Sequence, residues 1–197
     1  MKQKLFIACS IILLLSGCAS RSTSPIHFQF ISHDVRQTQL RQITRWQARG
    51  VLGIRNLSTN KGAVVNFLWN ENGNQYQIDF SAALNFVNAT LQGKPGSVDF
   101  RQGNKHYQAK SIAALMQQQF GWALPVRNLQ YWIKGQIAPG QSSETYDQYG
   151  HLKTLKQNGW QINYFAYTQV KNQDLPSRLT LINPQFNVRI VIKQWAI

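Results

Sequence analysis

The chain has 197 residues, of which 43% are hydrophobic and 12% aromatic. This length allows one domain with a real core, and the composition excludes both a wholly disordered chain and a polytopic membrane protein. Lys and Arg total 21 against 7 Asp and Glu, and the resulting formal charge of +14 favours anionic partners or surfaces. The two cysteines, Cys9 and Cys18, give neither a disulfide framework nor a cysteine-based zinc site.

Residues 1–17 are predicted to be a lipoprotein signal peptide. Lys2 and Lys4 precede an apolar run, Leu5–Leu15, that is too short to cross a hydrocarbon layer of ~30 Å as a helix. Leu15-Ser16-Gly17-Cys18 then resembles a bacterial lipobox, in which the cysteine becomes lipidated after cleavage. We therefore expect lipidation at Cys18; the alternative is an ordinary signal peptide that contains a cysteine.

Residues 18–33 are predicted to be the lipidated N-terminus and a tether, because Ser, Thr, Arg and Pro25 dominate this stretch. Ala19 follows the lipidated cysteine, and by the sorting rule of enteric bacteria alanine there allows export to the outer membrane. We therefore expect a protein anchored through Cys18 at the periplasmic face of the outer membrane, with residues 34–197 as its domain.

The first predicted element of this domain is a short helix that Asp34 caps and that carries Leu40, Ile43 and Trp46. From Trp46 the hydrophobic period becomes two, which predicts antiparallel strands up to about residue 109. Turns are expected at residues 72–74, 93–96 and 103–104, where Gly, Asn and Pro cluster.

Two helices are predicted to interrupt the strands. Ser111 precedes a helical stretch over residues 112–120, and Pro125 opens a second one that Gly135 ends. After a polar loop, strands are expected over residues 152–155, 160–166, 179–181 and 186–195, with Asn158-Gly159 as a hairpin turn. The pattern thus predicts an α+β fold of roughly ten antiparallel strands, with an interior that is either hollow and covered by the helices or filled with side chains.

Several strings resemble the LolB family of outer-membrane lipoprotein receptors over about residues 40–197. They are Trp46-Gln47-Ala48-Arg49-Gly50, Phe67-Leu68-Trp69, Leu91-Gln92-Gly93, Pro95-Gly96-Ser97-Val98, Leu124-Pro125-Val126, Tyr131-Trp132-Ile133-Lys134-Gly135, Gln157-Asn158-Gly159-Trp160 and Leu175-Pro176, with Gly121, Leu129, Tyr164 and Trp195. The resemblance implies an open, incomplete antiparallel β-barrel of roughly ten to eleven strands, with a helical lid that encloses a hydrophobic cavity.

The same resemblance implies a function. Members of the family accept lipoproteins from the soluble periplasmic carrier LolA and insert them into the outer membrane, without a cofactor. An exposed leucine after the third strand serves insertion, and the match places Leu84 there, in Ser81-Ala82-Ala83-Leu84-Asn85-Phe86. Ala83 and Asn85 replace the family's usual Pro and Gly, so Phe86 is expected to share the membrane contact. Packing of Leu84 on the sheet is the alternative.

Nine residues on the apolar faces of the predicted strands and helices are candidates for the lining of the acyl cavity: Val65, Phe67, Trp69, Tyr76, Ile78, Phe80, Leu91, Trp132 and Trp160. The expected partners are LolA with its lipoprotein cargo, acyl chains and outer-membrane lipid. We expect a monomer that binds neither nucleic acid nor metal.

Other function classes remain open at this stage. A lipid-anchored structural protein that bridges envelope layers would have no cavity and no cargo. An enzyme would need bases, for which His27, His33, His106 and His151 are the candidates, although none stands in a recognised catalytic spacing. We expect these histidines to be exposed and solvated, and we expect no enzymatic activity.

Overall fold

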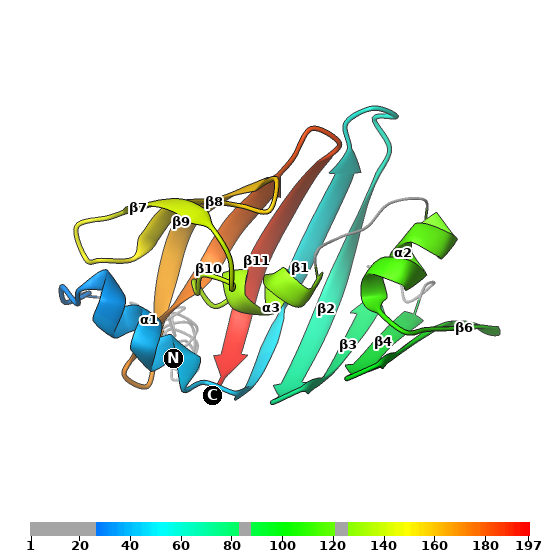
Figure 1. Cartoon of the computed structure of the whole chain (residues 1–197), viewed down its shortest axis with the longest axis horizontal. Helices are drawn as coiled ribbons and strands as arrows, with labels where there is room; N and C mark the ends of the chain where they lie inside the picture. Colours follow the sequence, from blue (N-terminus) through cyan, green and yellow to red (C-terminus); the bar gives the residue numbers. More distant parts are fainter. Residues whose placement is uncertain (1–26, 83–87, 121–125) are drawn as a thin grey trace, which may run out of the picture.

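A computed structural model of the chain describes residues 27–82, 88–120 and 126–197. These residues form three helices and eleven strands (Figure 1). The elements in chain order are α1 (His33–Arg41), β1 (Arg45–Asn56), β2 (Gly62–Asn72), β3 (Gln75–Ser81), β4 (Asn88–Lys94), β5 (Ser97–Gln102), β6 (Lys105–Ala109), α2 (Ile112–Phe120), α3 (Val126–Trp132), β7 (Ser142–Tyr146), β8 (Leu152–Gln157), β9 (Trp160–Val170), β10 (Gln173–Ile182) and β11 (Phe186–Ala196).

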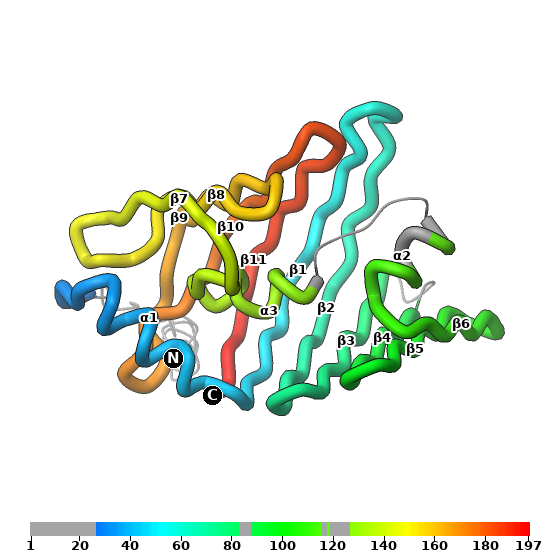
Figure 2. The backbone as a smooth tube through the Cα atoms, viewed as in Figure 1, coloured from blue at the N-terminus to red at the C-terminus, as the bar shows by residue number. Residues whose placement is uncertain are grey.

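All eleven strands belong to one antiparallel sheet, in the order β6-β5-β4-β3-β2-β1-β11-β10-β9-β8-β7. The edge strands β6 and β7 do not pair with each other, so the sheet is curved but not closed, and the helices lie across one of its faces (Figures 1 and 2). The open barrel with a helical cover is thus confirmed. We call the face that the helices cover the inner face of the sheet, and the opposite one its outer face.

The turn at Asn158-Gly159 shows why this part of the fold could be predicted. Gln157 pairs with Trp160 across the turn, and both turn residues have positive φ angles, 52° and 76°. A two-residue hairpin turn of this kind needs the left-handed conformation twice, which Asn and Gly tolerate best. The predicted hairpin between β8 and β9 is therefore confirmed.

Two details at the ends of elements differ from the prediction. Ser32, not Asp34, occupies the N-cap position of α1, and Asp34 lies within its first turn. The helix ends at Arg41 and therefore does not include Trp46. Trp46 belongs to β1, and its side chain is buried on the inner face of the sheet. In addition, β7 was not predicted, because it is a polar edge strand without apolar alternation.

The two halves of the sheet meet where β1 pairs with β11. A β-bulge between Arg49 and Gly50 shifts the register there. A Cβ atom on Gly50 would lie 2.1 Å from the carbonyl oxygen of Val191, so only glycine allows the two backbones to approach this closely.

The inner face of the half formed by β8–β11 is filled. Its largest core side chains are exposed by no more than 1% and include Leu155, Ile162, Leu179, Leu181 and Ile190. The Trp132 indole of α3 lies in the same core and donates a hydrogen bond to Oε1 of Gln157 (2.9 Å). This half therefore has the dense packing of an ordinary protein interior.

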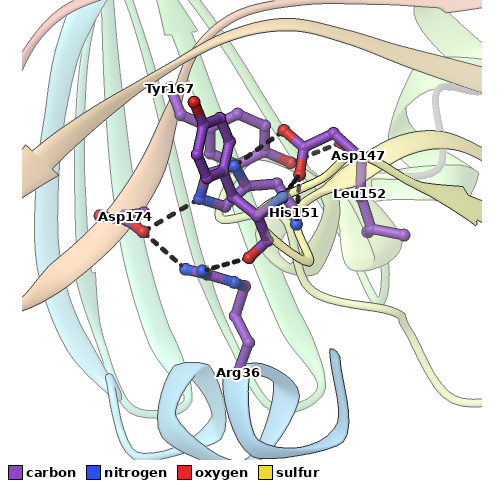
Figure 3. Close-up of polar contacts among 7 residues, drawn as sticks. Arg36, Asp147, His151, Leu152, Tyr167 and Asp174 are labelled. Carbon is purple, nitrogen blue, oxygen red and sulfur yellow. Dashed lines mark hydrogen bonds and ion pairs between the residues drawn. The ribbon is translucent and has the colours of Figure 1, made fainter. Parts of the chain in front are cut away.

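A buried polar network attaches α1 to this filled half (Figure 3). Arg36 of α1 donates to the Asp174 carboxylate of β10 (3.0 Å) and to the carbonyl oxygen of Tyr149 (3.1 Å). Nε2 of His151 lies 3.0 Å from the same Asp174 oxygen, and its Nδ1 lies 3.0 Å from Asp147. Both ring nitrogens of His151 thus face carboxylate oxygens, and Asp174 is shared between His151 and Arg36.

His151 is therefore a structural residue, and the expectation that it is solvated is wrong: it is 1% exposed. Its ring stacks on Tyr167 with ring centres 4.2 Å apart. Tyr167 in turn donates to the carbonyl oxygen of Leu152 (2.7 Å), which closes the network around the turn before β8 (Figure 3).

We predict that Asp174→Ala destabilises the protein by about 3–5 kcal/mol, because it leaves the buried Arg36 and His151 without their shared carboxylate. The matched control is Asp34→Ala, which removes an exposed pairing with His33 and is expected to change stability by less than about 0.5 kcal/mol. Urea unfolding of both variants measures the difference. Equal effects would contradict the structural role of the network.

Candidate functional site

The half of the sheet formed by β1–β5 is hollow on its inner face. A cavity of about 790 Å³ lies between these strands, the start of α2 and the segment from α3 to Pro139. Its apolar lining comprises Ile43, Trp46, Trp69, Tyr76, Val98, Ile112, Tyr131, Ile137, Ala138 and Pro139. The cavity is open on one side, so a ligand can enter it from solvent.

Aromatic rings form the wall of the cavity that belongs to the sheet. The ring centres of Trp46 and Trp69 are 5.2 Å apart, and those of Trp69 and Tyr76 are 6.5 Å apart. Behind them, Trp46 packs on Trp195, with ring centres 5.5 Å apart. Large rings in mutual contact have few alternative rotamers, so they form a rigid apolar wall.

Gly93 determines where the Tyr76 ring lies. The two residues are cross-strand partners on β4 and β3, and a Cβ atom on Gly93 would lie 2.2 Å from the Tyr76 ring. The ring can therefore lie across the β4 backbone only because residue 93 has no side chain. A glycine opposite an aromatic residue in a strand is the sequence signal for this arrangement.

Three polar side chains of the cavity are buried: Glu71, Lys134 and Gln136. Glu71 accepts a hydrogen bond from the Trp69 indole (2.9 Å), but burial still raises its pKa to about 7. Burial lowers the pKa of Lys134 to about 8, and its Nζ donates to the carbonyl oxygen of Ile43 (2.9 Å). Oε1 of Gln136 has no hydrogen-bond partner among the residues that the structure describes.

Four exposed cations surround the opening of the cavity: Arg41, Lys94, Lys110 and Arg127. They come from α1, the end of β4, the residue before Ser111 and the start of α3. The site therefore combines an apolar aromatic interior with a basic rim, which suits an apolar ligand or segment presented by an acidic partner.

A second cavity, of about 480 Å³, lies at the other end of β3 and β4. Phe67, Phe80 and Ala89 contribute its apolar surface, and Ser81 and Asn88 mark the strand ends beside it. The connection that begins there contains the predicted insertion residues Leu84 and Phe86. Both lie outside the described residues, as does Cys18.

The nine predicted lining residues divide between these environments. Trp69 and Tyr76 line the larger cavity, and Phe67 and Phe80 line the smaller one. The other five line neither: Ile78, Leu91, Trp132 and Trp160 are buried, and Val65 is half-buried. The contact of all nine with acyl chains stays a prediction.

Sequence reasoning missed several lining residues. Of these, Trp46 is the one that the sequence could best have indicated, because the alternation along β1 places it on the inner face together with Ala48. Ile43, Tyr131 and Ile137 lie in or next to turns, where hydrophobic periodicity carries no information about direction.

No histidine lines either cavity. His27, His33 and His106 are exposed as expected, and His33 and His106 contact the carboxylates of Asp34 and Asp99. His151 is enclosed in the network beneath α1.

Among the described residues, none of the helices combines the length and the apolar character that spanning a bilayer requires.

An open antiparallel sheet with a helical cover over an apolar cavity defines a class of fold that solved structures share. A LolA-superfamily protein from Nitrosomonas europaea superimposes with a TM-score of 0.51 at 7% identity, covering 85% of this chain and 94% of that one. A DUF1329-family protein from Desulfovibrio piger superimposes with a TM-score of 0.53 at 9% identity, covering 83% and 89%. At these identities the likeness concerns the fold alone.

The chain belongs to the LolB family of outer-membrane lipoproteins. The family described as "Outer membrane lipoprotein LolB" matches residues 44–195. The outer-membrane lipoprotein LolB of Coxiella burnetii (Nine Mile phase I) is 38% identical over 189 residues, covering 93% of this chain and 88% of that protein. The protein of the same name from Pseudomonas aeruginosa PAO1 is 36% identical over 203 residues, covering 99% and 97%.

The buried carboxyl of the cavity gives a prediction about pH. The pKa of Glu71 is raised from 4.5 to about 7, so the folded state holds its proton more tightly than the unfolded state. Its contribution to stability is fully present below pH 4.5 and is lost as the pH rises towards 7. Glu71→Gln keeps an acceptor for the Trp69 indole but does not ionise, so it should be more stable than the wild type at pH 8 by about 1–2 kcal/mol.

Urea unfolding of both proteins at pH 5 and pH 8 measures this difference. Asp79→Asn is the control, because it makes the same carboxylate-to-amide change on the outer face of the sheet, away from the larger cavity. If the free energy of unfolding changed by the same amount between pH 5 and pH 8 in Glu71→Gln and in the wild type, the Glu71 carboxyl would not be desolvated.

Proposed function

We propose that this chain accepts lipoproteins from the periplasmic carrier LolA, holds their acyl chains in the inner-face cavity and inserts them into the outer membrane. Membership of the LolB family and the shared fold support this function. The observation that carries it is the aromatic-walled cavity of about 790 Å³ under the helical cover. This volume lies within the range of roughly 300–1,000 Å³ that is usual for ligand pockets in proteins.

The proposal explains why the cavity is apolar yet open. A triacylated cysteine carries on the order of 45 methylenes, each worth ~0.8 kcal/mol when removed from water. Free passage through water would thus cost tens of kcal/mol, whereas transfer from one apolar cavity to another exchanges similar surroundings. No nucleotide and no enzymatic step are needed for such an exchange.

The basic rim supports contact with the carrier. Arg41, Lys94, Lys110 and Arg127 would attract an acidic surface around the mouth of the donor cavity, which raises the association rate and makes it depend on salt. The chain would act as a monomer, anchored through lipidated Cys18, with residues 18–33 as its tether and residues 34–197 as its domain.

The second candidate function is a lipid-anchored structural protein that bridges envelope layers without cargo. A structural protein has no use for an open cavity walled by tryptophans, so the cavity favours transfer. The two candidates differ in one measurable respect, which is whether a lipidated cargo enters the inner face.

We predict that a photo-crosslinking amino acid at Tyr76 captures the acyl chains of a lipoprotein delivered by LolA. The matched control is the same amino acid at Gln75, the preceding residue, which is exposed on the outer face of β3. Crosslinks are detected on gels with radiolabelled acyl chains. Capture at both positions or at neither would contradict cargo binding in this cavity.

We predict that Leu84→Glu preserves acceptance of cargo but blocks its delivery, because a charged side chain at position 84 would not enter the bilayer. Transfer from LolA to the variant, and from the variant to liposomes, are measured separately. Leu57→Glu changes an exposed leucine at the β1–β2 turn and serves as the control. If Leu84→Glu delivers cargo to liposomes normally, Leu84 has no role in insertion.

A further inference from the structure

The outer face of the sheet is uncovered, and its central half is strongly basic. Exposed cationic side chains project from β1, β10 and β11 on the side opposite the helices. They are Arg45, Arg49, Arg55, Arg178, Arg189 and Lys193. We name the outer surface of β1, β2, β9, β10 and β11 the outer basic face.

Carboxylates are missing from this face. Glu71 and Asp174 are the only acidic residues of these five strands, and both are buried, one in the cavity and one in the network with Arg36. None of the six cations forms an ion pair with a carboxylate of the described residues. Asp79 of the adjacent strand β3 lines the smaller cavity with Arg49 and Lys193, so unneutralised positive potential is expected mainly at Arg45, Arg55, Arg178 and Arg189.

Exposed apolar side chains lie among these cations. Val64, Phe165 and Val191 are 67%, 56% and 42% exposed. Val191 pairs with Arg178 on one side and with Val51 on the other, and the Arg178 guanidinium lies 5.9 Å from the centre of the Phe165 ring. Arg178 thus has apolar side chains as neighbours on this face, Val191 in its cross-strand row and the Phe165 ring on β9.

The other half of the outer face has a different chemistry. Asp79 and Asp99 project from β3 and β5, and Arg101 is paired with Asp99 at 3.0 Å. Amide side chains fill the rest: Gln92 donates to Gln77, and Gln108 donates to Asp99. The combination of free cations and exposed apolar groups is thus confined to the five central strands.

We propose that the outer basic face binds the surface of an anionic phospholipid bilayer. Each exposed Lys or Arg is attracted to an anionic membrane surface, and isolated apolar side chains among them can enter the interfacial region. The cations are spread over a broad, gently curved sheet: Arg49 and Lys193 line the smaller cavity, and the other four line no cavity among the described residues. Lipid headgroups, which move laterally, can meet such a distribution without a fixed complementary geometry.

The arrangement also orients the protein. The cavity lies on the inner face, so a membrane on the outer face leaves the cavity and its basic rim directed away from the bilayer, towards the periplasm. This consequence rests on the proposed function, whereas membrane binding itself does not. A failure of cargo transfer would leave the lipid interaction standing, and the two can be tested apart.

The test is cosedimentation of the chain from residue 19 onwards with lipid vesicles. Every described helix and strand lies between His33 and Ala196, so this chain contains the complete described fold, which circular dichroism verifies first. Vesicles of phosphatidylcholine with about one third phosphatidylglycerol are compared with vesicles of phosphatidylcholine alone. We expect binding to the anionic vesicles only, weakened by high salt.

The double variant Arg178→Glu/Arg189→Glu should reduce this partitioning by about tenfold or more. The control Lys105→Glu/Lys153→Glu makes the same change in net charge on β6 and β8, outside the five strands, and should reduce it by less than about threefold. Phe165→Ser/Val191→Ser should weaken binding without changing its salt dependence.

Equal losses in the two charge-reversal variants would overturn the proposal, because net charge alone would then explain binding. Absence of binding to anionic vesicles by a folded chain would also overturn it. So would binding of purified LolA through the arginines of the outer basic face in place of lipid, since the face would then be a protein interface.

Discussion

The antiparallel pairing of β1 with β11 is the interaction on which the architecture depends. Strands β1–β6 form one meander and β7–β11 form another, and only this pair joins them in the sheet. The approach is close enough to require Gly50 opposite the Val191 carbonyl, with a bulge beside it. The meanders are joined only through their end strands β1 and β11, at the centre of the sheet, so their other end strands, β6 and β7, are the two free edges. The helices that connect the meanders cover one face of this open sheet.

In this architecture one half of the sheet is densely packed, and the other half contains the cavity. The β8–β11 half is filled by aliphatic side chains and attached to α1 through Arg36, Asp174 and His151. The β1–β5 half is left hollow, with its wall supported from behind by Trp195 and fixed in shape by Gly93 beneath Tyr76. An apolar cavity tends to collapse because its lining lacks contacts on one side. Aromatic rings in mutual tilted and edge-to-face contact on a hydrogen-bonded sheet resist that collapse.

The parts of the fold that could be predicted are those with a local cause. Alternation predicted most strands, and Asn158-Gly159 predicted its hairpin because both residues tolerate positive φ. The strand β7 was not predictable, since a polar edge strand buries too little to leave a pattern. His151 resembled a loop histidine because its partner Asp174 lies 23 residues further along the chain, on β10, and meets it only in the folded sheet.

The sequence likewise did not predict which part of the interior is filled with side chains and which part is hollow. Trp69 and Trp132 have similar apolar contexts, yet one lines the cavity and the other is fully buried beside Gln157. Which tryptophan meets a void depends on where α3 crosses the sheet, and that position is set by contacts between distant segments, such as Gln37 with Gly135. Periodicity assigns a face to each residue, but it does not say whether the space in front of that face is occupied.

The two faces of the sheet together suggest how direction arises in transfer. Passage between apolar cavities is nearly balanced in free energy, so a preference of only about 1.4 kcal/mol at each step biases it about tenfold. Position would supply the rest if both proposals hold: a cavity open towards the carrier on one face, and a basic surface against lipid on the other, would keep the receiver next to the final acceptor. In the proposed transfer, the bilayer on the opposite face would be the final acceptor, because its capacity for acyl chains far exceeds that of any protein cavity.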